Sequence, residues 1–64
     1  MSTVLQEIAR KNSVEIEAIE KDVALGKCKD FASYQHTCGI VRGLRIANGN
    51  LQETAQQLEE NDDD

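Results

Sequence analysis

The stretch from Tyr34 to Leu58, YQHTCGIVRGLRIANGNLQETAQQL, decides the fold of this chain. Its mainly apolar positions recur at alternating spacings of three and four residues, which is the repeat of one stripe along a helix. The members of this stripe are Tyr34, Thr37, Val41, Leu44, Asn48, Leu51, Ala55 and Leu58. The pattern predicts one long helix over about residues 30–58.

A ridge of small residues runs beside this stripe. Gly39, Gly43 and Ala47 follow one another at a spacing of four residues. Glycine inside a helix costs about 1 kcal/mol relative to alanine. We expect close packing against another helix to offset that cost, and we therefore interpret the ridge as a helix-packing surface.

A second amphipathic helix is predicted over about residues 3–25. Its stripe consists of Leu5, Ile8, Asn12, Ile16, Ile19 and Val23. Gly26 follows the last apolar residue and is expected to be the left-handed cap of this helix, and Asp30 is expected to cap the next one. A connector as short as residues 26–29 joins antiparallel neighbours. The predicted fold class is all-α: one antiparallel helical hairpin over residues 1–58.

Each predicted helix has one weak point, Asn12 in the first and Asn48-Gly49 in the second. A capping box that starts a new helix would fit Asn12 with Glu15, and also Asn50 with Glu53. Alternatively the helices continue and a buried asparagine fixes their register. Continuity is favoured because both apolar stripes stay in phase across these points.

The chain is too small to be stable as a hairpin alone. It has 64 residues, of which 39% are hydrophobic, with one Phe and one Tyr. A chain of this length buries only about 60% of the surface that its unfolded form exposes. We therefore expect oligomerisation or a partner to complete the fold. The apolar residues off the main stripes that would serve this second surface are Val4, Val14, Leu25, Ile40, Ile46 and Ala47.

The negative charge is concentrated at the C-terminal end. Residues 1–50 contain all seven Lys and Arg and six acids, whereas residues 51–64 contain six acids and no base. The last six residues are expected to form a disordered acidic tail. Such an end suits docking on a basic protein surface and argues against contact with nucleic acid. The docking residues would be Glu59, Glu60, Asp62, Asp63 and Asp64.

No residue pattern indicates catalysis, a cofactor or a metal. His36 and Cys38 are two residues apart on a helix and point to different sides, and zinc needs four ligands. Cys28 completes no such set, and a chain this short lacks the mass for a catalytic cleft. We expect free thiols, with Cys38 in the hairpin core and His36 near the surface. Phe31 and Tyr34 are expected to be core anchors beside the turn.

Nothing in the sequence indicates export or membrane insertion. The N-terminal segment has no apolar run of the length of a signal peptide, and no segment approaches the roughly 20 apolar residues of a membrane span. The expectation is a soluble protein that is made in a cytoplasm.

Two segments carry a resemblance to a known group of proteins: LGKCKDFASY at residues 25–34 and CGIVRGLRIA at residues 38–47. A glycine turn, Asp-aromatic-Ala-x-x-Tyr, Gly-x-x-x-Gly-Leu and a long helix ending in acids resemble small proteins from the structural gene modules of tailed bacteriophages. The resemblance covers about residues 20–58. It implies a minor virion component, associated with the capsid, portal or neck. It also implies packing roles for Tyr34, Gly39, Gly43, Leu44 and Ala47.

These observations predict a non-enzymatic structural or assembly protein. Its expected partner is itself, a larger virion protein, or both, and its expected location is the virion. The alternative is a small acidic phage-encoded inhibitor or regulator that binds a host protein; a nucleic-acid contact through Arg42 and Arg45 is the weakest option. The residues predicted to pack against helices of the chain or its partner are Ile8, Ile16, Ile19, Tyr34, Gly39, Val41, Gly43, Leu44, Ala47 and Leu51.

Overall fold

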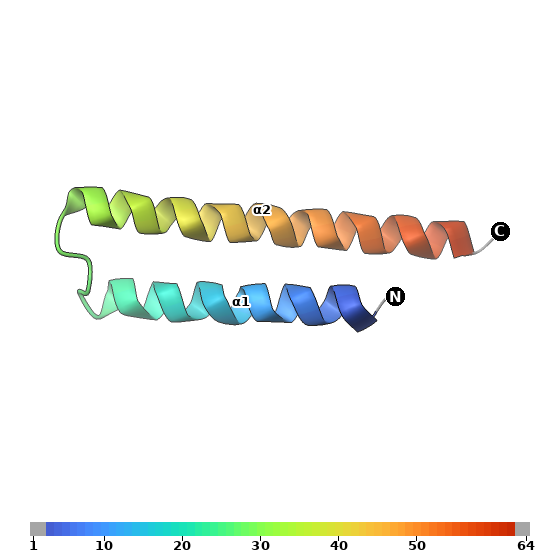
Figure 1. Cartoon of the computed structure of the whole chain (residues 1–64), viewed down its shortest axis with the longest axis horizontal. Helices are drawn as coiled ribbons and strands as arrows, with labels where there is room; N and C mark the ends of the chain where they lie inside the picture. The colour runs from blue at the N-terminus through green and yellow to red at the C-terminus, as the bar shows by residue number, and fades with distance from the viewer. Residues whose placement is uncertain (1–2, 63–64) are drawn as a thin grey trace.

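The chain folds into two antiparallel helices joined by a short turn (Figure 1). The computed structural model describes the backbone of residues 3–62 and the side chains as far as residue 60. Helix α1 spans Thr3–Ala24 and helix α2 spans Phe31–Asp62. No strand occurs within residues 3–62. The predicted all-α helical hairpin is confirmed.

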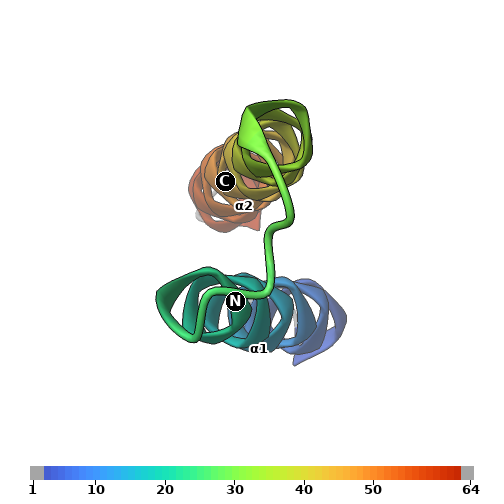
Figure 2. The ribbon, with the colours of Figure 1, turned by 90° about the vertical axis from the view of Figure 1, so that its left-hand side faces the viewer.

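The hairpin is a single layer of two rods, as the end-on view in Figure 2 shows. It measures 53 × 16 × 12 Å, and its radius of gyration is 15.2 Å. A compact domain of this length would have a radius of gyration of about 11 Å. Both faces of the layer are therefore open over the described residues, and only the strip between the helices is covered.

Both helices run unbroken through their asparagines. Asn12 Nδ2 donates a hydrogen bond of 2.9 Å to Asn48 Oδ1 in the other helix. Asn48 Nδ2 donates in turn to the carbonyl of Ala9 and to Ser13 Oγ, both at 3.2 Å. The side chains are thus occupied between the helices instead of capping their own backbone. The helices therefore continue through their asparagines, as predicted, and the capping boxes do not form.

The core is a narrow seam between α1 and α2. Only Ile16, Val41 and Ala55 are buried among the described side chains, at 8%, 9% and 1% exposure. Half-buried residues continue the seam to both ends: Leu5, Ala9, Asn12, Ile19 and Val23 on α1, and Thr37, Leu44, Asn48 and Leu51 on α2. All except Ala9 belong to the predicted stripes.

Three members of the predicted stripes lie outside the seam. Ile8, Tyr34 and Leu58 are each more than 40% exposed, and Ala9 takes the inward position next to Ile8. On α2 the reason is that a straight helix has 3.6 residues per turn, so a stripe with a spacing of about 3.5 rotates slowly away from a straight neighbour, and its ends at Tyr34 and Leu58 turn outward. On α1, Ala9 lies seven residues before Ile16, which is almost two full turns, and therefore faces the same way, whereas Ile8 lies at the edge of the stripe.

The structure corrects the prediction that Phe31 and Tyr34 anchor the core beside the turn. Phe31 is 70% exposed and Tyr34 is 43% exposed. Their rings stack on each other at the surface, with centroids 6.3 Å apart. Cys38, also expected in the core, is exposed. At this end α2 begins beyond the end of α1 (Figure 1), so α1 provides no surface that could bury Phe31, while Tyr34 and Cys38 line an open groove beside α1.

The turn after α1 is a Schellman motif. The Lys27 amide donates to the Asp22 carbonyl at 3.1 Å, and the Gly26 amide donates to the Val23 carbonyl at 3.0 Å. This pair of hydrogen bonds requires a residue with a left-handed backbone conformation at position 26, and Gly26 has a φ of 77°. The predicted glycine cap is confirmed.

Replacing this glycine tests the cap directly. Gly26→Ala leaves its Cβ in open space, so the penalty comes only from the left-handed backbone. We expect the free energy of unfolding to fall by about 1 kcal/mol. Urea unfolding followed by circular dichroism measures this value, and an unchanged midpoint would show that the turn tolerates another conformation.

Asp30 caps α2, as its sequence position predicts. The Ser33 amide donates a hydrogen bond of 2.8 Å to Asp30 Oδ1, and the Tyr34 amide donates to the Asp30 carbonyl at 3.1 Å. The backbone hydrogen bond from Ser33, supported by the Ser33 side chain, lowers the pKa of Asp30 below its ordinary 3.8. The ionised cap is therefore the form that the fold prefers.

This lowered pKa predicts acid sensitivity. Because the pKa is lower in the folded state, the stabilisation by Asp30 is complete above about pH 4 and is lost as the pH falls through the folded value. Asp30→Asn keeps an acceptor but cannot titrate, so we expect a shallower loss of helicity between pH 4 and pH 2. The variant should still lose some helicity in acid, because the pKa of Glu7 is also lowered, mainly by its hydrogen bond with Arg10. An identical acid profile in the variant would contradict the role of the cap.

The C-terminal end of α2 differs from the expectation of a disordered tail over residues 59–64. The helix continues to Asp62 and extends past the start of α1 (Figure 1). Residues 56–60 are Gln, Gln, Leu, Glu and Glu, all good helix formers. Their propensity explains the longer helix despite the acidic charge near its C-terminus. Asp63 and Asp64 lie outside the described residues.

Candidate protein-interaction surface

Large hydrophobic side chains remain on the outside of the hairpin. Nine of those in the described part of the chain are more than 40% exposed. They are Val4, Ile8, Val14, Leu25, Phe31, Tyr34, Ile40, Ile46 and Leu58. They include all the predicted surplus positions except Ala47, which is half-buried. Scattered apolar residues are ordinary on a protein surface, so what matters is where they gather.

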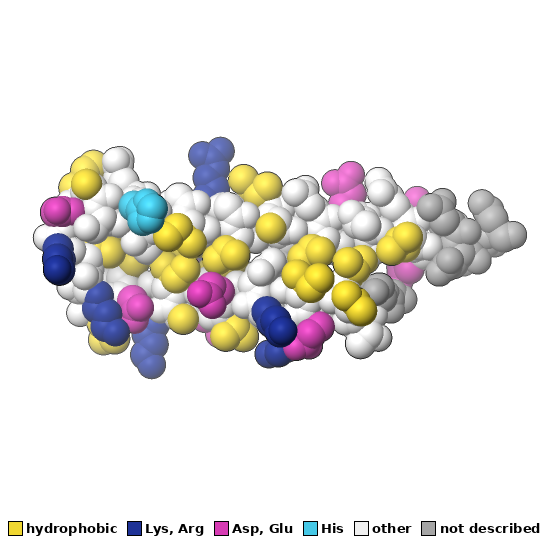
Figure 3. Space-filling model, in the orientation of Figure 1, with side chains coloured by type: hydrophobic (Ala, Val, Ile, Leu, Met, Phe, Trp, Pro, Cys, Tyr) yellow, Lys and Arg dark blue, Asp and Glu magenta, His cyan; other side chains and the backbone are white. Residues whose placement is uncertain are grey.

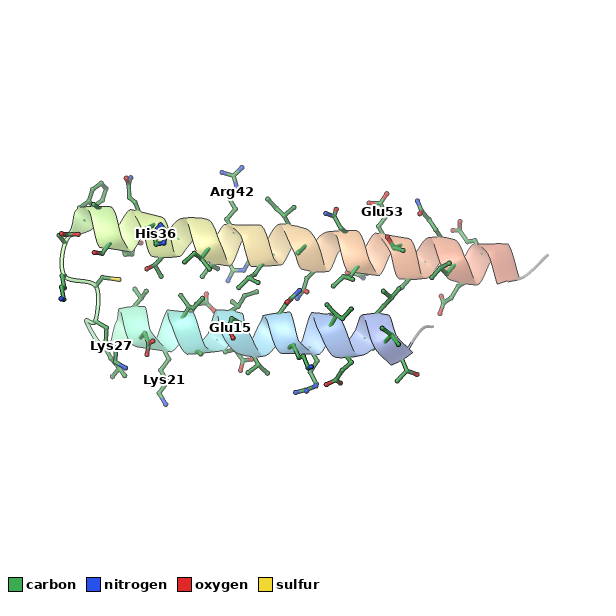
Figure 4. The ribbon with its side chains drawn as sticks, in the orientation of Figure 1. Glu15, Lys21, Lys27, His36, Arg42 and Glu53 are labelled. Carbon is green, nitrogen blue, oxygen red and sulfur yellow. The ribbon has the colours of Figure 1, made fainter. Side chains whose placement is uncertain are left out.

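Three of them, Ile8, Ile40 and Leu58, lie with half-buried apolar residues on one face of the hairpin, which we call the Ile40 face. On α2 this face consists of Ile40, Leu44, Ala47, Leu51 and Leu58, and on α1 it includes Ile8 and Ile19. Figure 3 looks onto this face and shows hydrophobic side chains following the seam between the helices. His36, one turn before Ile40, marks the same face in Figure 4. The apolar strip therefore runs along most of α2.

The opposite face has an apolar groove only near the turn. It is open, has a volume of about 620 Å³ and lies between Ile19 and Val23 of α1 and Tyr34, Cys38 and Val41 of α2. Farther from the turn, a second hollow on the same side is lined by polar and apolar residues together. They are Leu5, Gln6, Ala9, Arg10, Ser13, Asn48, Leu51 and Gln52. This face is therefore more mixed in character than the Ile40 face.

Charged residues frame the groove. Arg45 reaches across from α2 to Glu20 of α1, with Nη2 and Oε2 2.8 Å apart. Figure 4 shows Arg42 pointing away from α1, and Arg42 has no ion-pair partner among residues 3–60. An exposed pair such as Arg45–Glu20 adds little stability, so its main effect is to occupy one of the two arginines that were considered for phosphate binding.

The small-residue ridge does not contact α1. Gly39 and Gly43 are exposed, and a Cβ at either position would meet no atom within 4 Å. Only Ala47 turns partly inward, at the edge of the Ile40 face. The packing that would offset the cost of these glycines is absent from the hairpin itself.

The predicted packing residues thus occupy three different environments. Ile16 and Val41 are buried in the seam, and Ile19, Leu44, Ala47 and Leu51 are half-buried beside it. Ile8 and Tyr34 are exposed together with the two glycines. Of the predicted acidic docking residues, Glu59 and Glu60 are exposed on α2, Asp62 is its last residue, and Asp63 and Asp64 lie outside the described residues.

Ile40, predicted for the second surface, and Leu58, predicted for the main stripe, belong to the open face but were not among the predicted packing residues. The sequence signal for them is a second series with helical spacing, at positions 40, 44, 47, 51 and 58. This series is offset from the main stripe and shares Leu44, Leu51 and Leu58 with it. Two overlapping stripes are typical of a helix that packs against more than one neighbour.

Two thiols and a tyrosine lie near the turn. Cys28 and Cys38 are free, and Cys28 Sγ lies 4.0 Å from Thr37 Oγ1. Cys38 raises the pKa of Tyr34, mainly through a side-chain hydrogen bond. Over residues 3–60, no three His, Cys, Asp or Glu side chains lie close enough together to hold a metal ion.

Neither α1 nor α2 combines the length and the hydropathy needed to cross a membrane. Comparison of the chain with protein-family models, curated proteins and solved structures gives no match. The class of the molecule is therefore defined by its own geometry, which is a two-helix hairpin with an open apolar face.

Proposed function

We propose that this chain is a non-enzymatic assembly protein that works by helix–helix contacts with itself or with a larger protein. The observation that carries the proposal is that fewer large hydrophobic side chains are buried in the seam than are exposed on the surface. Among the described side chains, three are buried between the helices, while nine large hydrophobic ones are exposed. Apolar surface of this extent favours association because burial removes it from water.

The proposed setting is the virion of a tailed bacteriophage, where the chain would be a minor component beside the capsid, portal or neck. The support for this setting is the sequence resemblance over about residues 20–58. The hairpin agrees with it in one respect. Gly39 and Gly43, which the resemblance assigns to packing, face outward where another helix can approach them closely.

A glycine pair tests the packing role. Gly43→Leu leaves the hairpin folded, because the new side chain points into open space and leucine favours the helix by up to about 1 kcal/mol. We nevertheless expect assembly to be lost, because the side chain fills the ridge. Gly49→Leu is the matched control, since Gly49 is also helical and open but lies outside the ridge. Equal assembly of both variants would contradict the proposal.

The virion setting is tested on particles. Quantitative mass spectrometry of purified phage particles from the encoding genome should find the chain at a fixed stoichiometry to the portal protein. Particles that lack the chain, from lysates that contain it, would contradict the virion role.

A further inference from the structure

We infer that a second copy of this chain covers the Ile40 face. The two hairpins would form an antiparallel four-helix bundle with a two-fold axis perpendicular to the helices. The axis would cross α2 at the level between Ala47 and Asn48, and it would cross α1 at the level of Ser13. This inference rests on the proposed assembly function and names the occupant of its main apolar face.

The exposed area matches what such a dimer needs. The chain has a solvent-accessible surface of 5056 Å² and a mass of 7.1 kDa. A compact monomer of this mass exposes about 4,100 Å². The excess is close to the roughly 800 Å² per partner that a standard protein interface buries. One flat face packed on an identical face would remove it.

Two leucines of the Ile40 face are symmetric about one point of α2. Leu44 and Leu51 are equally far from the midpoint between Ala47 and Asn48. In an antiparallel pair of α2 helices centred there, Leu44 packs on Leu51 of the second copy, and Leu58 lies at the level of the half-buried Thr37. Ala47, with its small side chain, lies at the axis where the helices come closest. Such a self-complementary face is what a two-fold interface requires.

The outer edge of α1 is symmetric about the same level. The Asn12–Asn48 hydrogen bond of 2.9 Å places this part of α1 beside the midpoint of α2. Lys11 and Glu15 lie two residues on either side of Ser13, and neither has an ion-pair partner within the described part of the chain. The dimer therefore brings Lys11 of each copy to Glu15 of the other. Figure 4 shows Glu15 of α1 and His36 of α2 on the same face of the hairpin.

The charges at the two ends of the hairpin favour the antiparallel arrangement. Glu59 and Glu60 lie near the end of α2, whereas Lys27 and Lys29 lie in the turn that precedes it. Antiparallel packing about this axis puts Glu59 and Glu60 of one copy at the level of His36 and Gln35 of the other, in the N-terminal half of its α2 helix. Acids are stabilising at a helix N-terminus and destabilising at a C-terminus. A parallel dimer would instead place acids beside acids.

The first test is sedimentation equilibrium of the full chain over a range of concentrations, with two exposed isoleucines compared. Ile40→Glu puts a charge on the proposed interface, and we expect the dissociation constant to rise roughly 100-fold. Ile46→Glu is the matched control, since Ile46 is exposed on the same helix but lies outside the Ile40 face. A monomeric parent chain, or a dimer unaffected by Ile40→Glu, would overturn the inference.

A charge reversal tests the axis without touching the seam. Lys11→Glu and Glu15→Lys each create two repulsive pairs across the dimer, and we expect each to weaken it roughly tenfold at low salt. The double variant restores opposite charges and should recover the parent dissociation constant. Failure of this recovery would contradict the proposed register.

Disulfide trapping distinguishes the two orientations. In a background with Cys28→Ser and Cys38→Ser, we expect Ala47→Cys to form a cross-linked dimer on oxidation, because each Ala47 lies at the axis. Leu58→Cys lies far from the axis in the antiparallel dimer and should stay uncross-linked. Cross-linking at both positions would indicate a parallel dimer and overturn the antiparallel one.

The outcomes separate this inference from the proposed function. A chain that is monomeric in solution but present in particles would refute the second copy as occupant and leave the assembly role standing. A stable dimer that is absent from particles would support the second copy as occupant and contradict the virion setting.

Discussion

Ile16→Ala should lower the free energy of unfolding of the hairpin by roughly 3 kcal/mol. Ile16 is the one buried side chain of α1 among the described residues, at 8% exposure. Removing a buried isoleucine costs about 2–5 kcal/mol, through lost burial and the cavity left behind. A domain of this size rarely has more than about 3–5 kcal/mol in total. The variant should therefore be largely unfolded at 25 °C when it is dilute.

The measurement is helical circular dichroism during urea titration, with Val14→Ala as the control. Val14 lies on the same helix, is 51% exposed and points away from the seam. We expect Val14→Ala to be neutral or slightly stabilising, because alanine is the better helix former. Equal effects of the two substitutions would mean that α1 is not docked on α2 as described.

Asn48→Ala should destabilise the hairpin by about 2 kcal/mol. Asn48 accepts one hydrogen bond from Asn12 and donates to Ala9 and Ser13. Its truncation leaves Asn12 half-buried without that partner, and an unsatisfied polar group in such a position costs about 1–3 kcal/mol. Alanine regains only a few tenths of a kcal/mol in helix propensity.

The control for Asn48 is two residues away. Asn50 is exposed on the opposite side of α2, so Asn50→Ala should raise helicity slightly. The double variant Asn12→Leu and Asn48→Leu should melt at a higher temperature but lose a unique register, because polar pairs in a helical seam act mainly on specificity. Broadened amide resonances in its NMR spectrum would report that loss. Sharp, well-dispersed resonances would contradict the register role.

Local features followed directly from the sequence. The Gly26 cap, the Asp30 cap and the continuity of both helices depend on φ angles and on hydrogen bonds between residues a few positions apart. These interactions are the same wherever the helix lies in space. The positions of Ile16 and Val41 in the seam were predictable for a related reason, since a stripe with helical spacing has to face its only neighbour.

The tertiary structure decided how each helix is rotated about its own axis and what that rotation exposes. It replaced Ile8 by Ala9 in the seam, turned Phe31 and Tyr34 outward, and left Gly39 and Gly43 away from α1. On α2 the rotation depends on the small mismatch between a stripe spacing of about 3.5 and the 3.6 residues of a helical turn, which accumulates along a straight helix. It also depends on the hydrogen bond between Asn12 and Asn48, which sets these two residues side by side along the helices. Both are properties of the pair of helices, so neither helix sequence by itself contains them.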